Sequence, residues 1–176
     1  MFDVITPICD NVISRLFVGD IITISGYIHT GRDAVLPKIV SLIEKGRLEE
    51  YGINLKGAVI FHTAVSPAGV GPTSSNKYDI ENSIPALSQA GVKLHLGKGA
   101  LSRKTIEALN TYKSVYAVIP PVTALLKSKT IQQKVIAFPE LGLEAFYLLE
   151  IKGYPAIIAA AHGKSIYKNE KWRGNH

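Results

Sequence analysis

The feature of this chain that most constrains its fold is the alternation of apolar runs of strand length with amphipathic stretches of helical period. In chain order the patterns indicate strand at 20–28, helix at 30–44, strand at 57–62, helix at 80–90, strand at 92–96, helix at 102–110, strand at 115–119, helix at 122–127 and strands at 134–138, 146–151 and 156–160. Such alternation predicts an α/β fold in which helices cover a sheet. With 176 residues, 47% of them hydrophobic, the chain is long enough to bury its core as a single domain over 1–176.

Three strand-to-helix corners carry polar groups, at 27–33, 69–79 and 97–102. We predict that Arg32 begins a helix, and that Gly71 and Pro72 break a strand before a loop that enters the next helix. Ligands of open α/β sheets bind at such corners. The cations there, Arg32, Lys77 and Lys98, are of the kind that holds carboxylates or phosphates, although a solvated surface charge is an alternative reading for each.

Charge and cysteine content limit the classes of function. The net charge of +6 suits anionic ligands in general, but no interleaved basic and aromatic platform favours nucleic acid. Much of the excess lies in the last residues, and we predict a loose basic tail from about 168. No apolar run is long enough to span a membrane and no targeting signal precedes the first strand, so we expect a cytoplasmic protein. A single cysteine, Cys9, gives neither a disulfide nor a metal site of its own.

Four segments in order resemble one known family. They are SGYIHTGRDAVLPKI, GAVIFHTAVSPAGVGPTSSNKYD, GVKLHLGKGALS and FPELGLEAFYLLEIKGYPAIIA. Together they are similar to the β subunit, or C-terminal domain, of class I fumarases and the related L-tartrate dehydratases, over about residues 6–167. One short motif such as GKG is weak evidence, whereas four in family order are specific.

The resemblance implies a swivelling β/β/α fold and one half of a two-part hydro-lyase. In that family a cysteine-bearing α subunit holds a four-iron, four-sulfur cluster, and this chain looks like the cluster-free half, with no metal of its own. The expected reaction is the reversible hydration of fumarate to L-malate, with L-tartrate or another hydroxy-dicarboxylate as the alternative substrate. The expected assembly is a hetero-oligomer, or a homodimer in isolation.

The family pattern also assigns roles to residues. By resemblance, Arg32 in TGRD and Lys98 in GKG match carboxylate-binding residues, and Thr73 in GPTSS matches the base that takes the carbon-bound proton. A helix or turn cap remains the competing interpretation of Thr73. Lys77 stands where the family has an arginine. Further candidates at the corners are His29, His62, Gly97 and Gly99.

Two departures from the family pattern bear on the substrate. Lys77 keeps the charge of the usual arginine but loses its bidentate fork, and Tyr78 replaces a methionine. The stretch His62–Pro67 replaces an alanine-glycine-proline turn, and the histidine that often follows the TGRD motif is absent. A non-catalytic swivelling domain that binds an anion or a protein is therefore the alternative from another class.

Overall fold

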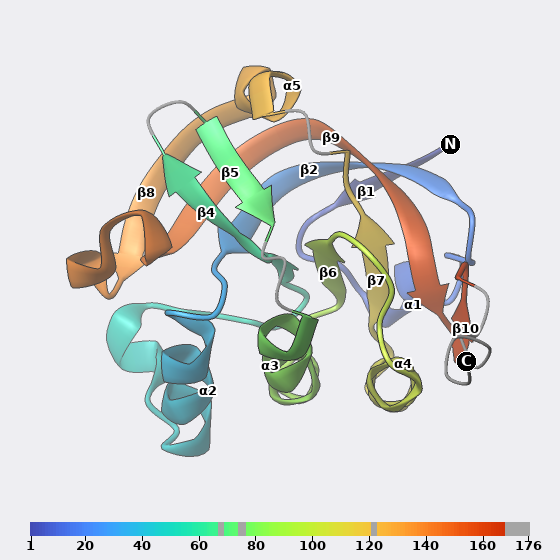
Figure 1. The fold of residues 1–176 in the computed structure, drawn as a ribbon, viewed down its shortest axis with the longest axis horizontal. Helices are drawn as coiled ribbons and strands as arrows, with labels where there is room; N and C mark the ends of the chain where they lie inside the picture. The colour runs from blue at the N-terminus through green and yellow to red at the C-terminus, as the bar shows by residue number, and fades with distance from the viewer. Residues whose placement is uncertain (67–68, 74–76, 121–122, 168–176) are drawn as a thin grey trace, which may run out of the picture.

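The computed structural model describes residues 1–66, 69–73, 77–120 and 123–167, and these residues form a mixed α/β structure (Figure 1). The predicted basic tail and the Pro67 departure lie outside the described residues. In chain order the elements are β1 (Phe2–Ile5), α1 (Asp10–Ile13), β2 (Ile21–Thr30), α2 (Leu36–Glu44), the 3₁₀ helix η1 (Leu48–Tyr51), β3 (Val59–Phe61), β4 (Thr63–Ser66), β5 (Gly69–Thr73), α3 (Lys77–Gln89), β6 (Leu94–Gly97), α4 (Arg103–Thr111), β7 (Val115–Val118), α5 (Thr123–Ser128), β8 (Thr130–Ala137), the 3₁₀ helix η2 (Pro139–Glu144), β9 (Phe146–Ala161) and β10 (Lys164–Ser165).

The main sheet closes on itself like a barrel. Strands β2, β3, β6 and β7 lie side by side and all run parallel, and β9 pairs antiparallel with both β2 and β7. One long strand therefore joins the two edges of the parallel set. Alternate side chains of these strands point inward and form the largest core cluster, which includes Ile24, Phe61, Leu96, Ala117 and Tyr154.

Three helices cover the outside of the barrel along one side, visible as the lower row of coils in Figure 1. Helix α2 buries Leu36, Ile39 and Leu42 in a second cluster that also contains Ile60 of β3. Helices α3 and α4 share a third cluster, in which Ile84 packs with residues of β7 and β9. The β4–β5 hairpin is a separate two-stranded sheet, which in Figure 1 extends from beside β6 toward β8 and α5.

The structure corrects three of the predicted elements. Helix α2 begins at Leu36, so Arg32 lies in the turn before the helix, because Pro37 suits the first helical turn and residues 33–35 form a turn of their own. The two strands predicted at 146–151 and 156–160 are one 16-residue strand, β9. Gly71 and Pro72 lie inside β5, which is possible because a two-stranded sheet consists of edge strands.

The other predicted elements agree with the structure to within a few residues. Ser102 is the N-cap of α4, and its hydroxyl accepts a hydrogen bond from the Thr105 amide, as the sequence predicts. No described helix is long and apolar enough to cross a membrane.

Candidate active site

The carboxyl ends of the parallel strands bring the predicted corners together. Thr30 at the end of β2 lies opposite Phe61 at the end of β3, and Phe61 lies opposite Leu96 in β6. The ladder continues beyond the strands, since the Gly31 amide donates to the Phe61 carbonyl at 3.1 Å and the His62 amide donates to the Leu96 carbonyl at 3.0 Å. The turns that carry Arg32 and Lys98, and the β3–β4 junction, therefore meet at one edge of the barrel.

The β4–β5 hairpin returns the third corner to the same edge. Strand β4 begins at Thr63, directly after His62, and Thr73 at the end of β5 pairs with Thr63. Helix α3 then begins at Lys77. The backbone of Thr73 thus lies next to the β3–β4 junction, within the same group of corners as Arg32 and Lys98.

The carboxylate of Glu144, which no motif in the sequence indicates, accepts hydrogen bonds from Arg32. The Nε atom of Arg32 donates to Oε1 of Glu144 at 2.7 Å, and Nη2 donates to the same oxygen. Glu144 ends η2, and β9, which pairs with β2, begins two residues later. The hydrogen bond that Arg32 donates to Glu144 raises the pKa of the half-buried Arg32 guanidinium, so Arg32 is positively charged at every physiological pH.

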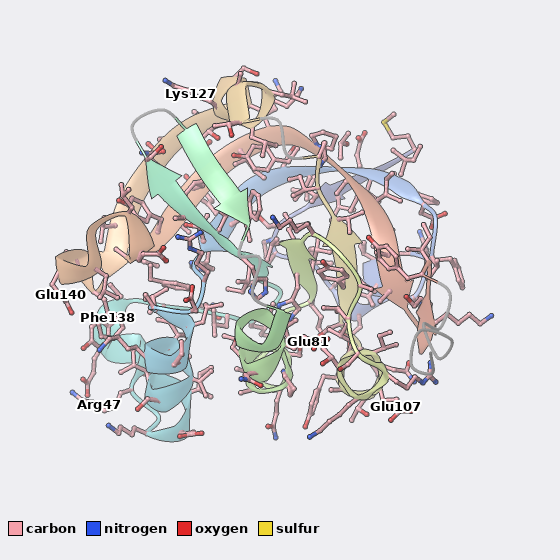
Figure 2. All side chains as sticks on the ribbon, in the orientation of Figure 1. Arg47, Glu81, Glu107, Lys127, Phe138 and Glu140 are labelled. Carbon is pink, nitrogen blue, oxygen red and sulfur yellow. The ribbon has the colours of Figure 1, made fainter. Side chains whose placement is uncertain are left out.

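The turn that carries Lys98 is fixed from two sides. Gly97 ends β6, and a Cβ atom there would lie 3.2 Å from the hydroxyl of Tyr116. That hydroxyl donates to the Gly99 carbonyl at 3.1 Å, and Gly99 has a φ of 79°, which favours glycine. The Glu81 carboxylate on α3, labelled in Figure 2, accepts a hydrogen bond from the Ser102 amide. Lys98 itself is exposed, so its ammonium group is available to a ligand.

Beneath this edge, His62 belongs to a buried chain of polar side chains. Its Nε2 atom lies 3.0 Å from Nδ1 of His95 in β6, and Nε2 of His95 lies 2.9 Å from the Ser88 hydroxyl on α3. Burial lowers the pKa of His62 to about 3. Burial and the neighbouring His62 also hold the pKa of His95 well below its usual value, so both rings are neutral at physiological pH.

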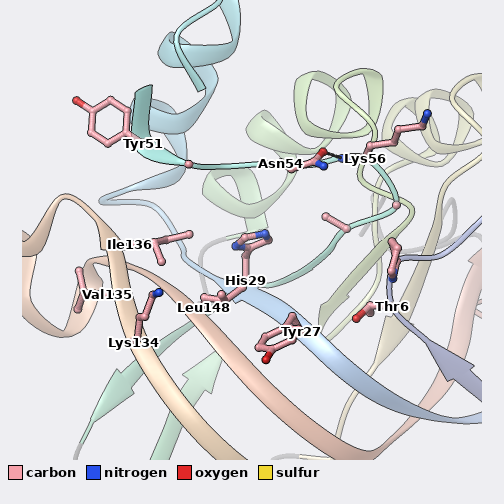
Figure 3. A pocket seen from close by; sticks show the side chains of 14 residues that line it. Thr6, Tyr27, His29, Tyr51, Asn54, Lys56, Lys134, Val135, Ile136 and Leu148 are labelled. Atoms are coloured by element: carbon pink, nitrogen blue, oxygen red, sulfur yellow. Dashed lines mark hydrogen bonds between the residues drawn. The ribbon is translucent and has the colours of Figure 1, made fainter. Parts of the chain in front are cut away.

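His29 lies in a different place. Its ring rises from β2 into a hollow of about 590 Å³ between β8 and the segment 51–58, together with Lys56 and Lys134 (Figure 3). The ring stacks on Phe146 with centroids 5.0 Å apart, and burial lowers its pKa to about 4, against the opposing effect of a hydrogen bond with the Asn54 backbone. Neither Arg32 nor Lys98 lines this hollow, so His29 is not grouped with them.

The position of the cysteine bears on where an iron–sulfur cluster could be bound. Cys9, the one cysteine of the sequence, is exposed and directly precedes α1. Its neighbour Ile8 donates its amide to the Gly57 carbonyl before β3, and Asp10 forms an ion pair with Lys93 just before β6. Cys9 therefore lies at the amino ends of the parallel strands, at the opposite edge of the barrel from Arg32. Within the described residues, no group of three or more His, Cys, Asp or Glu side chains is suited to a metal. A single cysteine cannot provide the several thiolates that usually hold a four-iron, four-sulfur cluster.

Sequence reasoning missed the residues that support the corners. Glu144 lies within one of the four family-like segments, yet nothing local in the sequence indicates that it reaches Arg32, 112 positions away. Tyr116, His95 and Ser88 lie in ordinary strand and helix patterns, and their partners are set by strand order alone. Only His95 had a local signal, because it lies in an alternating strand next to the turn at 97–99.

Fold and edge together define a class of protein: a mixed α/β barrel with two cations, Arg32 and Lys98, on turns at the carboxyl ends of its parallel strands. Residues 2–170 match the family described as Fumarase C-terminus, and the chain belongs to that family.

Individual relatives agree with this membership. The putative L(+)-tartrate dehydratase subunit beta of Methanocaldococcus jannaschii is 28% identical over 171 residues, which cover 89% of this chain and 86% of that protein. The L(+)-tartrate dehydratase subunit beta of Escherichia coli (strain K12) is 28% identical over 94% of this chain and 86% of its own length. The anaerobic class I fumarate hydratase of the same strain is 28% identical over 83% of this chain, and the match spans only 28% of that longer protein.

The buried histidines predict how stability depends on pH. The pKa values of His29 and His62 in the folded chain, about 4 and about 3, lie below the usual value of 6.5, so the unfolded chain binds more protons between these values. The free energy of unfolding therefore has its full value above about pH 6.5 and falls as the pH decreases toward 3. Each extra proton bound on unfolding costs about 1.4 kcal/mol per pH unit.

Urea unfolding at pH 7.5, 5.5 and 4.5 measures this effect. His29→Phe, which removes a titrating ring but keeps an aromatic side chain on Phe146, should lose less stability than the parental chain between pH 6.5 and 4.5. Equal losses in the two proteins would contradict the assignment of a neutral buried His29.

Proposed function

We propose that this chain is the β subunit of an iron–sulfur-dependent hydro-lyase that reversibly hydrates fumarate to L-malate, with the cluster held by a separate, cysteine-bearing α subunit. The observation that carries the proposal is the meeting of three separate corners at one barrel edge in a chain of the Fumarase C-terminus family. Two of these corners carry the cations Arg32 and Lys98, and the third carries Thr73 and Lys77.

A dicarboxylate suits this group of residues. Arg32 binds one carboxylate through its guanidinium, which the Glu144 carboxylate orients on its Nε side. Lys98, on a turn fixed by the Tyr116 hydroxyl, binds a carboxylate as a point charge. Lys77, the first residue of α3, is the third cation of the predicted corners. These contacts orient the substrate, so that the C–H bond that reacts faces Thr73.

In this proposal the hydroxyl oxygen of Thr73 takes the proton from the substrate carbon. A threonine hydroxyl is a poor base at its ordinary pKa, and the nearby positive charges of Lys77, Lys98 and Arg32 favour its deprotonated form. The hydroxide leaves the neighbouring carbon, and the partner's cluster, when bound, supplies a Lewis acid for that group. This chain supplies no ligand to the cluster, which agrees with the position of Cys9 at the opposite edge.

The assembly follows from the same division of labour. Two relatives that this chain matches over 86% of their length are named as β subunits, which supports a hetero-oligomer with an α subunit. We further propose that the barrel is the swivelling β/β/α domain of the family, that the chain is a single domain, and that the enzyme works in the cytoplasm.

L-tartrate is the second candidate substrate. The observation in its favour is that the relatives of similar length are named L(+)-tartrate dehydratase subunits, whereas the named fumarate hydratase is a much longer protein. The lysine at position 77 also favours a change in how one carboxylate is held, because an ammonium group does not offer the two parallel donors of a guanidinium. Initial rates of the two-chain complex with L-malate and with L-tartrate distinguish the two.

Replacing either proposed carboxylate ligand should impair the complex of this chain with its cysteine-bearing partner. Hydrogen bonds to charged groups contribute about 1.5 to 3 kcal/mol, so Arg32→Ala or Lys98→Ala should lower kcat/KM about 10- to 100-fold. Because Lys98 is exposed, Lys98→Ala should leave the melting temperature unchanged.

Lys104→Ala is the matched control, since Lys104 is an exposed lysine on α4 just beyond the same turn. It should leave both kcat/KM and melting temperature at parental values. Parental kinetics in both the Arg32→Ala and Lys98→Ala complexes would show that these cations do not bind substrate.

Loss of a catalytic base at Thr73 should lower turnover at an unchanged melting temperature, whereas loss of a cap should lower the melting temperature. Thr73→Val keeps the shape of the side chain in strand β5 but removes the oxygen, so turnover should fall about 100- to 10,000-fold while substrate binding stays near parental. Thr73→Ser keeps the oxygen and should retain most of the rate. Equal rates for the Val variant and the parental complex would exclude Thr73 as the base.

A further inference from the structure

Three polar side chains from three different elements are buried together behind the barrel edge. His62 and His95 have no exposed surface and Ser88 has 2% of its surface exposed. Their ring nitrogens and hydroxyl form the chain described above, with separations of 3.0 and 2.9 Å. A neutral imidazole has one donor and one acceptor, so each link fixes the orientation of both partners.

One end of this series of hydrogen bonds lacks a partner among the described residues. The buried Nδ1 atom of His62 has no hydrogen-bond partner among the described residues. Buried polar groups are costly unless they are paired, and apolar residues of similar volume fill such space without that cost. Three buried polar side chains with one open end therefore call for an explanation other than stability.

The positions of the three residues supply that explanation. His62 joins β3 to β4, whose first residue, Thr63, pairs with Thr73. His95 lies in β6, three residues before Lys98. Ser88 lies in α3, the helix that begins at Lys77. His62 thus directly precedes the hairpin that contains Thr73, His95 lies in the strand that precedes Lys98, and Ser88 lies in the helix that begins at Lys77.

We propose that His62, His95 and Ser88 form a brace that positions the β4–β5 hairpin, the end of β6 and helix α3 relative to one another. This inference rests on the proposed function: the brace holds Thr73, Lys98 and Lys77 in the arrangement that one dicarboxylate requires. The three are positioning residues, since they act through the backbone elements and not by contact with the substrate. Directional hydrogen bonds fix the register of these elements, whereas apolar packing lets them slide.

The test compares the brace with a separate buried hydrogen bond. His95→Leu removes both links of the brace and keeps an apolar side chain of similar size. Ser114→Ala is the control, because the buried Ser114 hydroxyl donates to the Val92 carbonyl at 2.7 Å at the amino ends of β6 and β7. His95→Asn is the conservative variant, since its amide can replace the ring Nδ1 in the link to His62.

In the two-chain complex, His95→Leu should lower kcat/KM at least tenfold, with kcat falling more than KM rises, because the groups still bind but are misaligned in the transition state. His95→Asn should recover at least a third of the lost rate despite its smaller volume. Ser114→Ala should stay within twofold of parental. Parental kinetics in His95→Leu, an equal loss in Ser114→Ala, or no recovery in His95→Asn would overturn the brace.

Amide hydrogen exchange on the full chain tests the brace without reference to activity. His95→Leu should speed exchange of the His62 amide, which donates to the Leu96 carbonyl, at least tenfold relative to the Ser114 amide, and Ser114→Ala should not. If the parental complex turns over no hydroxy-dicarboxylate, the proposed function fails and this ratio alone decides the brace. A uniform change of exchange across both amides would contradict it.

Discussion

The pairing of β9 with both β2 and β7 is the constraint on which the rest of this structure depends. Without it, four parallel strands would form an open sheet, with β2 and β7 as its edges. The 16-residue strand joins those edges and encloses the largest core cluster. Because all four enclosed strands run the same way, closure draws their carboxyl ends into one ring, and the turns that follow them face a common space.

The same strand also helps to place the residue that orients Arg32. Glu144 ends η2, two residues before β9 begins, and antiparallel pairing of β9 with β2 brings it to the turn after β2. Closure of the barrel and placement of one of its cations thus depend on the same strand pairing. The Glu144 carboxylate accepts from both Nε and Nη2, which fixes the orientation of the guanidinium in its turn. The buried carboxylate of Glu81 and the phenol of Tyr116, whose pKa burial raises, similarly fix the turn of Lys98.

Local patterns in the sequence predicted most of the helices and strands, but not which of them lie side by side. Apolar alternation identified β2, β3, β6 and β7, and Ser102 correctly marked the start of α4. The hairpin β4–β5 escaped because a strand that contains Gly71 and Pro72 looks like a loop, and only its place in a two-stranded sheet tolerates them. Gly153 and Pro155 lie between the two strands predicted within β9. They fall where β9 leaves its pairing with β8 and has not yet reached β7.

The candidate site divides in the same way. Arg32, Lys98 and Thr73 could be proposed from the sequence because they lie in recognisable motifs, whereas the contacts of Glu144, Tyr116, His95 and Ser88 depend on how the elements pack. His29 has a local context as suggestive as that of Arg32, yet its side chain enters the hollow next to β8. Successive side chains of a strand point to opposite faces of the sheet, so a shift of one position changes the face on which a side chain lies.

The most direct test of this account is substrate-dependent hydrogen–deuterium exchange of the chain in its complex with the cysteine-bearing partner. We predict that adding L-malate or L-tartrate slows exchange in segments 31–36 and 97–102, at the carboxyl ends of the parallel strands, and leaves segments 7–14 and 51–58 unchanged. Slowing confined to 7–14 or 51–58 would contradict the account, because the ligand would then occupy the opposite edge of the barrel or the hollow of His29.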